Sequence, residues 1–196
     1  MSEYHCLPVY PLPSEAKLAQ QQADAQQRTT LESPALSIMT DLRHVPAAII
    51  NSSATLQEAN TQMMMRGVKL LFVSTLREGL AGLITYTDLM GEKPILFSRQ
   101  SGEQRRNIQV RDIMTPRAKL EVMMLADINH ARVGQIVSTL AKAGRQHALV
   151  LDSVDGAICG IFSKTEISRR LGMEIESSGL ALTFAEMEAQ LAQLAN

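Results

Sequence analysis

The sequence has no tryptophan, few other aromatic residues and only two cysteines, and each scarcity argues against a class of protein. Aromatic residues make up 4% of its 196 residues, whereas 45% are hydrophobic, so we expect a folded core that is aliphatic and rich in methionine. Cys6 and Cys159 lie far apart and form no C-x-x-C pair. A disulfide framework and a cysteine-ligated zinc site are therefore not expected.

An excess of one charge and long apolar runs are lacking as well. The 19 basic residues are balanced by 20 acidic ones, so the net charge of −1 is unlike that of most nucleic-acid-binding proteins. No apolar run approaches the roughly 20 residues that span a membrane. Residues 1–13 lack the basic and apolar segments of a signal peptide. We expect a reduced, cytoplasmic protein that binds neither membrane nor nucleic acid.

Catalytic motifs are likewise missing. The sequence contains no G-x-S-x-G, P-loop or G-x-G-x-x-G motif. Its four histidines stand at no metal-ligand spacing with cysteine or carboxylate side chains: His5, His44, His130 and His147. The methionine runs 63–65 and 123–124 are interpreted as adaptable core rather than as a soft-metal site. We expect a protein that is not an enzyme and holds no metal.

An internal repeat begins at Ser37. The two copies open with Ile-Met-Thr at residues 38–40 and 113–115. Each opening is followed by an apolar run and then by an amphipathic, helix-spaced stretch that ends in glycine. These segments cover residues 45–50 and 55–67 in the first copy, and residues 120–125 and 129–144 in the second. In the first helix we expect Leu56, Ala59, Met63 and Met64 to share the buried face.

Each copy continues with two short strands joined by a turn. The strands are expected at residues 70–74, 80–84, 147–151 and 157–162, and Asp155-Gly156 is a strong hairpin signal. Each copy closes with Gly-h-h-[ST]-x-[ST]-[DE], where h is apolar, at residues 82–88 and 160–166. Gly67 precedes Asp88 by 21 residues and Gly144 precedes Glu166 by 22. The shared order and spacing indicate a duplication.

This order of elements over residues 37–172 resembles the CBS domain, and two copies in tandem resemble a Bateman module. The resemblance implies an α/β (α+β) fold of two β-α-β-β-α repeats, paired through their sheets around a pseudo-two-fold axis with ligand clefts between them. It also implies a homodimer. We divide the chain into an arm, first repeat, connector, second repeat and terminal helix: residues 1–36, 37–91, 92–109, 110–172 and 173–196.

The two terminal segments fall outside the resemblance. The arm is rich in alanine and glutamine, and either disorder or a helix fits its composition. Thr183-x-x-Glu186 is a capping box, and an apolar stripe follows it. That stripe is expected to pack either in the core or on a partner subunit.

Thr85, Thr87 and Asp88 lie where a strand ends and a helix begins. Free backbone N–H groups at a helix start suit phosphate, and a carboxylate can accept both hydroxyls of a ribose. The resemblance implies that Asp88 is the ribose ligand and that Thr85 and Thr87 contact phosphate. Thr85-x-x-Asp88 is equally readable as a plain helix cap, which contributes about 1 kcal/mol to stability.

The second junction keeps Ser163 and Thr165 but has Glu166 in place of aspartate. Ser163-x-x-Glu166 also fits a capping box. Because the extra methylene displaces the carboxylate and adds a rotatable bond, we expect a stronger site at Asp88 and a weaker or degenerate one at Glu166. Residues expected to supplement binding, or to form a solvated basic face, are Arg145, His147, Lys164, Arg169 and Arg170. Lys69 and Leu70 are their counterparts in the first repeat, where backbone contacts and apolar packing against adenine are expected to hold the ligand.

The function implied is a non-catalytic regulatory module that requires no cofactor. It would sense an adenine nucleotide (AMP, ADP or ATP) in a cleft between the repeats and signal to an unknown partner protein. Two alternatives stay open. One is a ligand-free dimerisation or interaction module, and the other is a CBS pair that binds S-adenosylmethionine or a dinucleotide.

Overall fold

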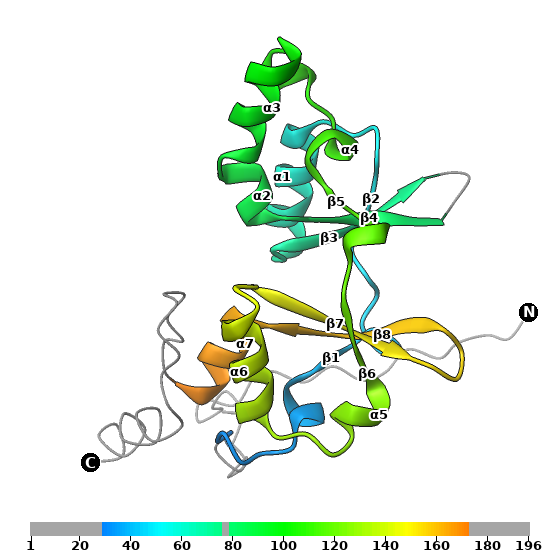
Figure 1. Cartoon of the computed structure of the whole chain (residues 1–196), viewed down its shortest axis with the longest axis vertical. Helices are drawn as coiled ribbons and strands as arrows, with labels where there is room; N and C mark the ends of the chain where they lie inside the picture. The colour runs from blue at the N-terminus through cyan, green and yellow to red at the C-terminus, as the bar shows by residue number, and fades with distance from the viewer. Residues whose placement is uncertain (1–28, 76–78, 173–196) are drawn as a thin grey trace, which may run out of the picture.

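The computed structural model describes residues 29–75 and 79–172. Residues 1–28 of the expected arm, the expected helix at 173–196 and Cys6 lie outside the described residues. The described chain forms two similar bodies, each with a four-stranded sheet (Figure 1). The sheets face each other, and the helices lie on their outer sides. This mixed arrangement confirms the expected fold class.

Both bodies have the order β-α-β-β-α. In the first body these elements are β2 (Ile49–Asn51), α1 (Leu56–Arg66), β3 (Leu70–Thr75), β4 (Gly79–Thr85) and α2 (Tyr86–Met90). In the second they are β6 (Val122–Met124), α6 (Val133–Lys142), β7 (His147–Asp152), β8 (Ala157–Ser163) and α7 (Lys164–Leu171). The remaining elements are η1 (Ala35–Ile38), β1 (Thr40–Asp41), α3 (Lys93–Ser101), η2 (Arg105–Asn107), α4 (Val110–Ile113), β5 (Thr115–Pro116), η3 (Arg117–Lys119) and α5 (Leu125–Ile128).

The two sheets exchange their edge strands. One sheet has the order β2-β3-β4-β5 and the other β1-β8-β7-β6, so β5 completes the sheet of the first repeat and β1 that of the second. Thr40 pairs with Ile161, and Thr115 pairs with Leu83. The chain crosses between the bodies twice, from β1 to β2 and from β5 to β6 (Figure 1). Each Met-Thr opening thus pairs with the other repeat rather than with its own.

Two glycines make room for the exchanged segments. A Cβ on Gly82 would collide with the Thr115 carbonyl oxygen and lie 3.2 Å from the Met114 sulfur. A Cβ on Gly160 would collide with the Met39 sulfur. Each repeat thus presents a glycine to the Met-Thr segment of the other repeat. This contact explains why the Met-Thr opening and the glycine of the closing motif occur in both repeats.

Helix α1 shows how local sequence sets an element. Thr55 and Glu58 form a capping box, in which the Thr55 amide donates to Glu58 Oε2 at 2.7 Å. The helix ends at Gly67, whose φ of 64° lies in the left-handed region.

The three consecutive methionines of α1, residues 63–65, correct one expectation. Met63 is buried, but Met64 is 72% and Met65 83% exposed. Successive residues lie about 100° apart around a helix, so burying Leu56, Ala59 and Met63 turns the next two side chains outward. The interpretation of 63–65 as core is therefore wrong for Met64 and Met65.

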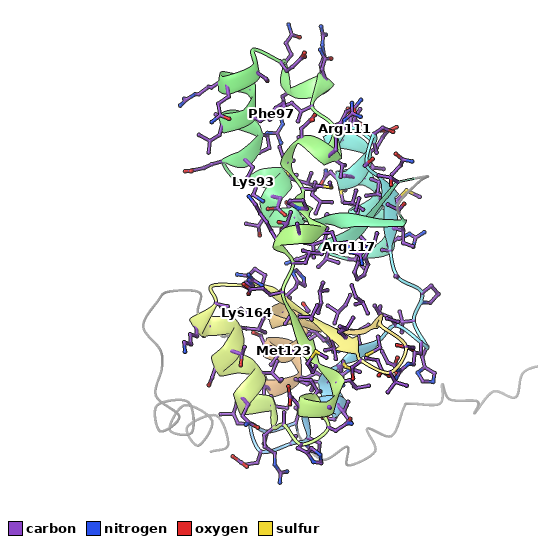
Figure 2. The ribbon with its side chains drawn as sticks, turned by 45° about the vertical axis from the view of Figure 1, so that its right-hand side comes forward. Lys93, Phe97, Arg111, Arg117, Met123 and Lys164 are labelled. Atoms are coloured by element: carbon purple, nitrogen blue, oxygen red, sulfur yellow. The ribbon has the colours of Figure 1, made fainter. Side chains whose placement is uncertain are left out.

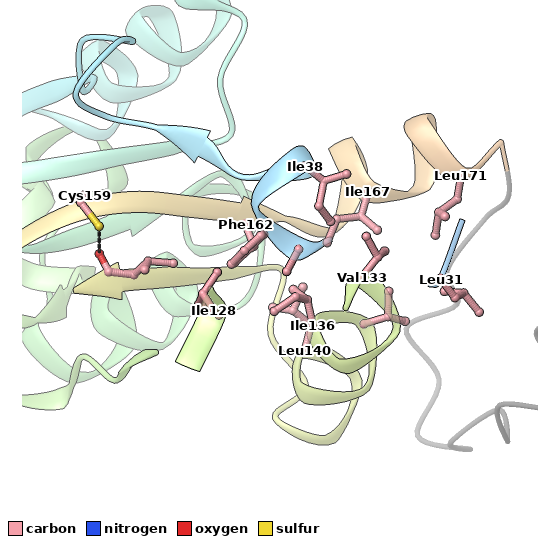
Figure 3. Packing of buried hydrophobic residues seen from close by; sticks show 13 residues of the cluster. Leu31, Ile38, Ile128, Val133, Ile136, Leu140, Cys159, Phe162, Ile167 and Leu171 are labelled. Atoms are coloured by element: carbon pink, nitrogen blue, oxygen red, sulfur yellow. Dashed lines mark hydrogen bonds between the residues drawn. The ribbon is translucent and has the colours of Figure 1, made fainter. Parts of the chain in front are cut away.

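The described residues bury three apolar clusters. One lies under α1 and includes Ile108, Val110 and Ile113, and another lies under α6 and α7 and includes Leu31, Ala35 and Ile38 (Figure 3). The third joins the sheets through Leu70, Phe72 and Leu149.

The clusters include residues from segments that were expected to lie outside the two repeats. Leu31 and Ala35 from the expected arm belong to the second body, and Ile108 from the expected connector belongs to the first. The connector also contains the helix α3. Each body therefore takes core residues from the segment that precedes its exchanged strand.

Cys159 lies inside the second cluster. Its thiol donates to the Val150 carbonyl at 3.6 Å (Figure 3), and burial raises its pKa. A thiol held protonated in an apolar core is a poor nucleophile. Between residues 29 and 172, leaving out 76–78, no helix is long and apolar enough to cross a membrane.

Candidate functional site

The two strand-to-helix junctions are built alike. Leu70 pairs with Thr85 across β3 and β4, and His147 pairs with Ser163 across β7 and β8. The Tyr86 amide, at the start of α2, donates to the Lys69 carbonyl at 2.9 Å. The Lys164 amide, at the start of α7, donates to the Gln146 carbonyl at the same distance. Leu70 and His147 are therefore equivalent positions beside the two junctions.

At the first junction the helix cap is present. Asp88 Oδ2 accepts hydrogen bonds from the Thr85 amide and from Thr85 Oγ1, both at 2.8 Å, and the Asp88 amide donates back to Thr85 Oγ1 at 3.2 Å. Lys93 Nζ lies 2.6 Å from Asp88 Oδ1, and Lys93 is labelled in Figure 2. Both oxygens of this carboxylate thus have donors, while the Thr87 side chain is exposed.

At the second junction the expected capping box is wrong. Ser163 precedes α7 without a side-chain cap hydrogen bond. Glu166 instead binds Arg169 Nη2 and Arg170 Nε through Oε1, both at 2.7 Å, and Arg169 Nε through Oε2 at 2.9 Å. These arginines, the hydrogen bond from Arg169 above all, lower the pKa of Glu166 to about 2.

The longer glutamate side chain accounts for this difference. It reaches the arginines one helical turn further on, where charge-assisted hydrogen bonds are stronger than a neutral cap. Arg169 and Arg170, expected near phosphate, therefore hold the carboxylate. An acidic residue followed by arginine at i+3 and i+4 is a sequence signal that could have predicted this arrangement.

A cavity of about 600 Å³ lies between the repeats, beside the second junction. Ser163, Thr165, Glu166 and His147 line it from the second repeat. The first repeat and the crossing segment, residues 42–48, contribute cationic and apolar side chains, among them Arg66, Lys69, Leu70, Phe72 and Ala47. Thr85, Thr87 and Asp88 do not line this cavity.

A second cavity, also of about 600 Å³, lies near the ends of the β3–β4 and β7–β8 hairpins. Its described lining is apolar apart from Ser74 and Arg117, the latter labelled in Figure 2. It contains none of the junction residues, so the hydroxyls and the carboxylate favour the first cavity as the candidate polar ligand site.

His147 is the most perturbed base of the site. Its Nδ1 is buried and has no hydrogen-bond partner within the described residues. Burial first, and then the charge of Lys69, lower the pKa of His147 to about 4, against a raising effect of Asp88. The imidazole is therefore neutral at physiological pH.

Arg145 and Lys164 do not line the cavity either. The Arg145 guanidinium pairs with Glu121 at 2.8 Å. Lys164 is buried, with 6% of its surface exposed, and is labelled in Figure 2. Sequence reasoning missed Arg66 and Lys93, whereas Lys69, named as a counterpart in the first repeat, does line the cavity.

No family model and no curated protein matches the sequence. Among solved structures, the chain is similar to an uncharacterized conserved protein from Pyrococcus horikoshii at 22% identity, with a TM-score of 0.55 and coverage of 76% of this chain and 100% of the other. For protein MJ1225 from Methanocaldococcus jannaschii the identity is 15% and the TM-score 0.51, with coverage of 69% and 49%.

A third similar structure names the fold. It is the CBS domain of a bacterial CNNM/CorC family Mg²⁺ transporter, 18% identical, with a TM-score of 0.50 and coverage of 74% of this chain and 79% of the other. Three features agree with this similarity: the two sheets exchange edge strands, the two strand-to-helix junctions are alike, and a cavity lies between the repeats. The chain has the fold of a tandem pair of CBS domains.

Proposed function

We propose that this chain is a non-catalytic regulatory module that binds an adenine nucleotide in the cavity beside Glu166. The observation that supports this most is the composition of the cavity. Apolar side chains from both sheets lie on it together with three hydroxyls (Thr40, Ser163 and Thr165), a carboxylate and two cationic side chains. Its volume of about 600 Å³ falls in the range of small-ligand sites, which is about 300–1,000 Å³.

Each part of a nucleotide has a matching part of the cavity. Leu70, Phe72 and Ile161 offer an apolar wall for adenine. Ser163 and Thr165 lie at the start of the eight-residue helix α7, whose partial positive charge suits phosphate. Arg66 and Lys69 add cationic groups on the first repeat.

Glu166 is the proposed ribose ligand of this cavity. Its Oε1 accepts from both Arg169 and Arg170, whereas Oε2 accepts only from Arg169 and keeps a lone pair for one ribose hydroxyl. The second hydroxyl would compete with the arginines at Oε1. The lowered pKa keeps the group an acceptor over the whole physiological range.

Asp88 is the proposed ligand of a second site, related to the first by the duplication. Its Oδ2 accepts two hydrogen bonds from Thr85, and its Oδ1 is bound by Lys93. A ribose would have to share or displace these donors. The same holds for Glu166 and its arginines, but Glu166 lines the cavity and Asp88 does not. On that ground we propose the Glu166 cavity as the stronger site, the reverse of the order expected from the aspartate.

The regulatory part of the proposal concerns what the ligand changes. A ligand acts on a partner protein only if it binds one arrangement of the two bodies more tightly than another. The cavity is lined by both bodies and by the crossing segment, so its occupancy bears on how they pack. The partner and a homodimeric assembly are parts of this proposal.

Calorimetric titration tests the ligand. The full chain would be titrated with AMP, ADP, ATP and S-adenosylmethionine, beside the variants Glu166→Gln, Asp88→Asn and the control Asp127→Asn. Asp127 is an exposed acid that does not line the cavity. We expect saturable nucleotide binding that weakens about tenfold or more in Glu166→Gln and stays unchanged in Asp127→Asn, because a charged hydrogen bond contributes roughly 1.5–3 kcal/mol.

The other outcomes decide between the alternatives. Binding lost only in Asp88→Asn would move the site to the first junction. Binding of S-adenosylmethionine alone would replace the nucleotide as ligand. Heat from none of the four compounds would favour a ligand-free interaction module.

A further inference from the structure

Each acidic junction residue is linked through a basic side chain to a backbone carbonyl. Arg170 Nε lies 2.7 Å from Glu166 Oε1, and its Nη1 donates to the Ser37 carbonyl at 2.7 Å. Lys93 Nζ lies 2.6 Å from Asp88 Oδ1 and 3.4 Å from the Ile113 carbonyl. In both bodies a single cation thus bridges a carboxylate and the main chain.

The two carbonyls lie at nearly equivalent places in the duplication. Ser37 comes shortly before the exchanged strand β1, and Ile113 shortly before the exchanged strand β5. Each exchanged strand is only two residues long, so its ladder holds it with few hydrogen bonds. One further bond next to such a strand adds to the burial of Ala35 and Ile38, which also holds the segment before β1.

The link is stronger in the second body. The planar guanidinium of Arg170 presents separate N–H groups to two acceptors, both at 2.7 Å. The single ammonium of Lys93 is 3.4 Å from its carbonyl. The segment that Arg170 holds also leads directly into the crossing segment, where Leu42 and Ala47 line the cavity.

We propose that Arg170 is a positioning residue that couples Glu166 to the exchanged strand β1, and that Lys93 does the same, more weakly, between Asp88 and β5. The ligand-dependent half of this proposal rests on the proposed function. A ribose that donates to Glu166 competes with Arg170 for Oε1. Once the guanidinium loses the carboxylate that orients it, its bond to the Ser37 carbonyl weakens and β1 loosens.

The chain contains a matched control for this coupling. Arg169 also binds Glu166, through Nε at 2.9 Å and Nη2 at 2.7 Å. No hydrogen bond joins it to the main chain before β1 within the described residues. Arg169→Gln and Arg170→Gln therefore remove the same charge from the same carboxylate, and only the second removes the link to Ser37.

Amide hydrogen exchange of the ligand-free chain tests the link by itself. The reporter is the Leu42 amide, which donates to the Cys159 carbonyl at 2.9 Å and so measures the attachment of β1. We expect Arg170→Gln to accelerate its exchange about threefold or more, the factor for a net hydrogen bond at the low end of its usual worth. Arg169→Gln leaves the rate unchanged. Equal rates in the two variants would overturn the link.

Unchanged exchange in α1 of the first body shows that each variant stays folded. A second arm adds saturating AMP to the wild-type chain, where we expect faster exchange at Leu42, and to Arg170→Gln, where we expect no further change. If the variant accelerates exchange but AMP has no effect, the link stands and the nucleotide half is overturned. If Arg170→Gln has no effect without AMP, the link is wrong whatever AMP does.

Discussion

The sulfur of Met114, in the second repeat, lies 3.2 Å from the position that a Cβ on Gly82 of the first repeat would occupy. The same Cβ would collide with the backbone carbonyl of Thr115. This contact between repeats fixes how closely β5 can approach β4, and it makes the strand exchange testable by two substitutions.

Gly82→Ala is expected to destabilise the chain by roughly 1–3 kcal/mol, as overpacking of a close contact does. Gly160→Ala is expected to cost less, because the atoms it would meet belong to the flexible side chain of Met39. Urea unfolding of both variants measures the difference. Equal costs, or a larger cost at Gly160, would contradict the described packing of β5.

Removing the hydroxyl is expected to cost stability at the first junction and almost none at the second. Thr85→Ala removes a cap and is expected to lower the free energy of unfolding by about 1 kcal/mol. Ser163→Ala is expected to change it by a few tenths of a kcal/mol, because Ser163 makes no cap hydrogen bond. Thermal unfolding without ligand tests this pair, and a comparable loss in both variants would restore the capping box at Ser163.

His147 makes stability depend on pH. Its pKa falls from 6.5 to about 4 on folding, so the unfolded chain binds the proton first as the solution is acidified. Stability is therefore complete above pH 6.5 and is lost between pH 6.5 and about 4, by up to about 3 kcal/mol.

Urea unfolding across that interval checks the prediction. His147→Gln removes the dependence, whereas His130→Gln, which replaces an exposed histidine, keeps it. A flat profile in the wild-type chain would contradict the buried, neutral imidazole.

Glu166 contributes in a lower interval of pH. Its pKa falls from 4.5 to about 2 on folding, so its stabilising contribution is present above pH 4.5 and disappears as the pH falls to about 2. Above that interval the wild-type chain should melt at a higher temperature than Glu166→Gln, and the two should converge near pH 2. A difference that stays constant would mean that the arginines do not hold the ionised carboxylate.

The sequence predicted the strands of both hairpins because local signals set them. Apolar runs separated by the turn residues Asp155-Gly156 mark β7 and β8, and helix-spaced apolar residues that end at Gly67 mark α1. The exchange of β1 and β5 left no local signal, because it depends on which sheet each segment meets after crossing. Core membership of Leu31 and Ile108 was missed for the same reason.

The junctions show where side-chain reach decides the outcome. Both sequences fit a capping box, yet only Asp88 forms one, since Glu166 is long enough to meet the arginines at i+3 and i+4. The cavity was anticipated only as a cleft between repeats. Its position beside Glu166 depends on the crossing segment and on Arg66 and Lys69, which no motif brings together.

A crystal structure of the full chain with AMP is the decisive test of nucleotide binding beside Glu166. We expect the adenine against Phe72 and Ile161, the phosphate at Ser163 and Thr165, and the ribose hydroxyls on Glu166. Nucleotide bound only at Asp88, or density absent from the cavity at saturating AMP, would contradict it.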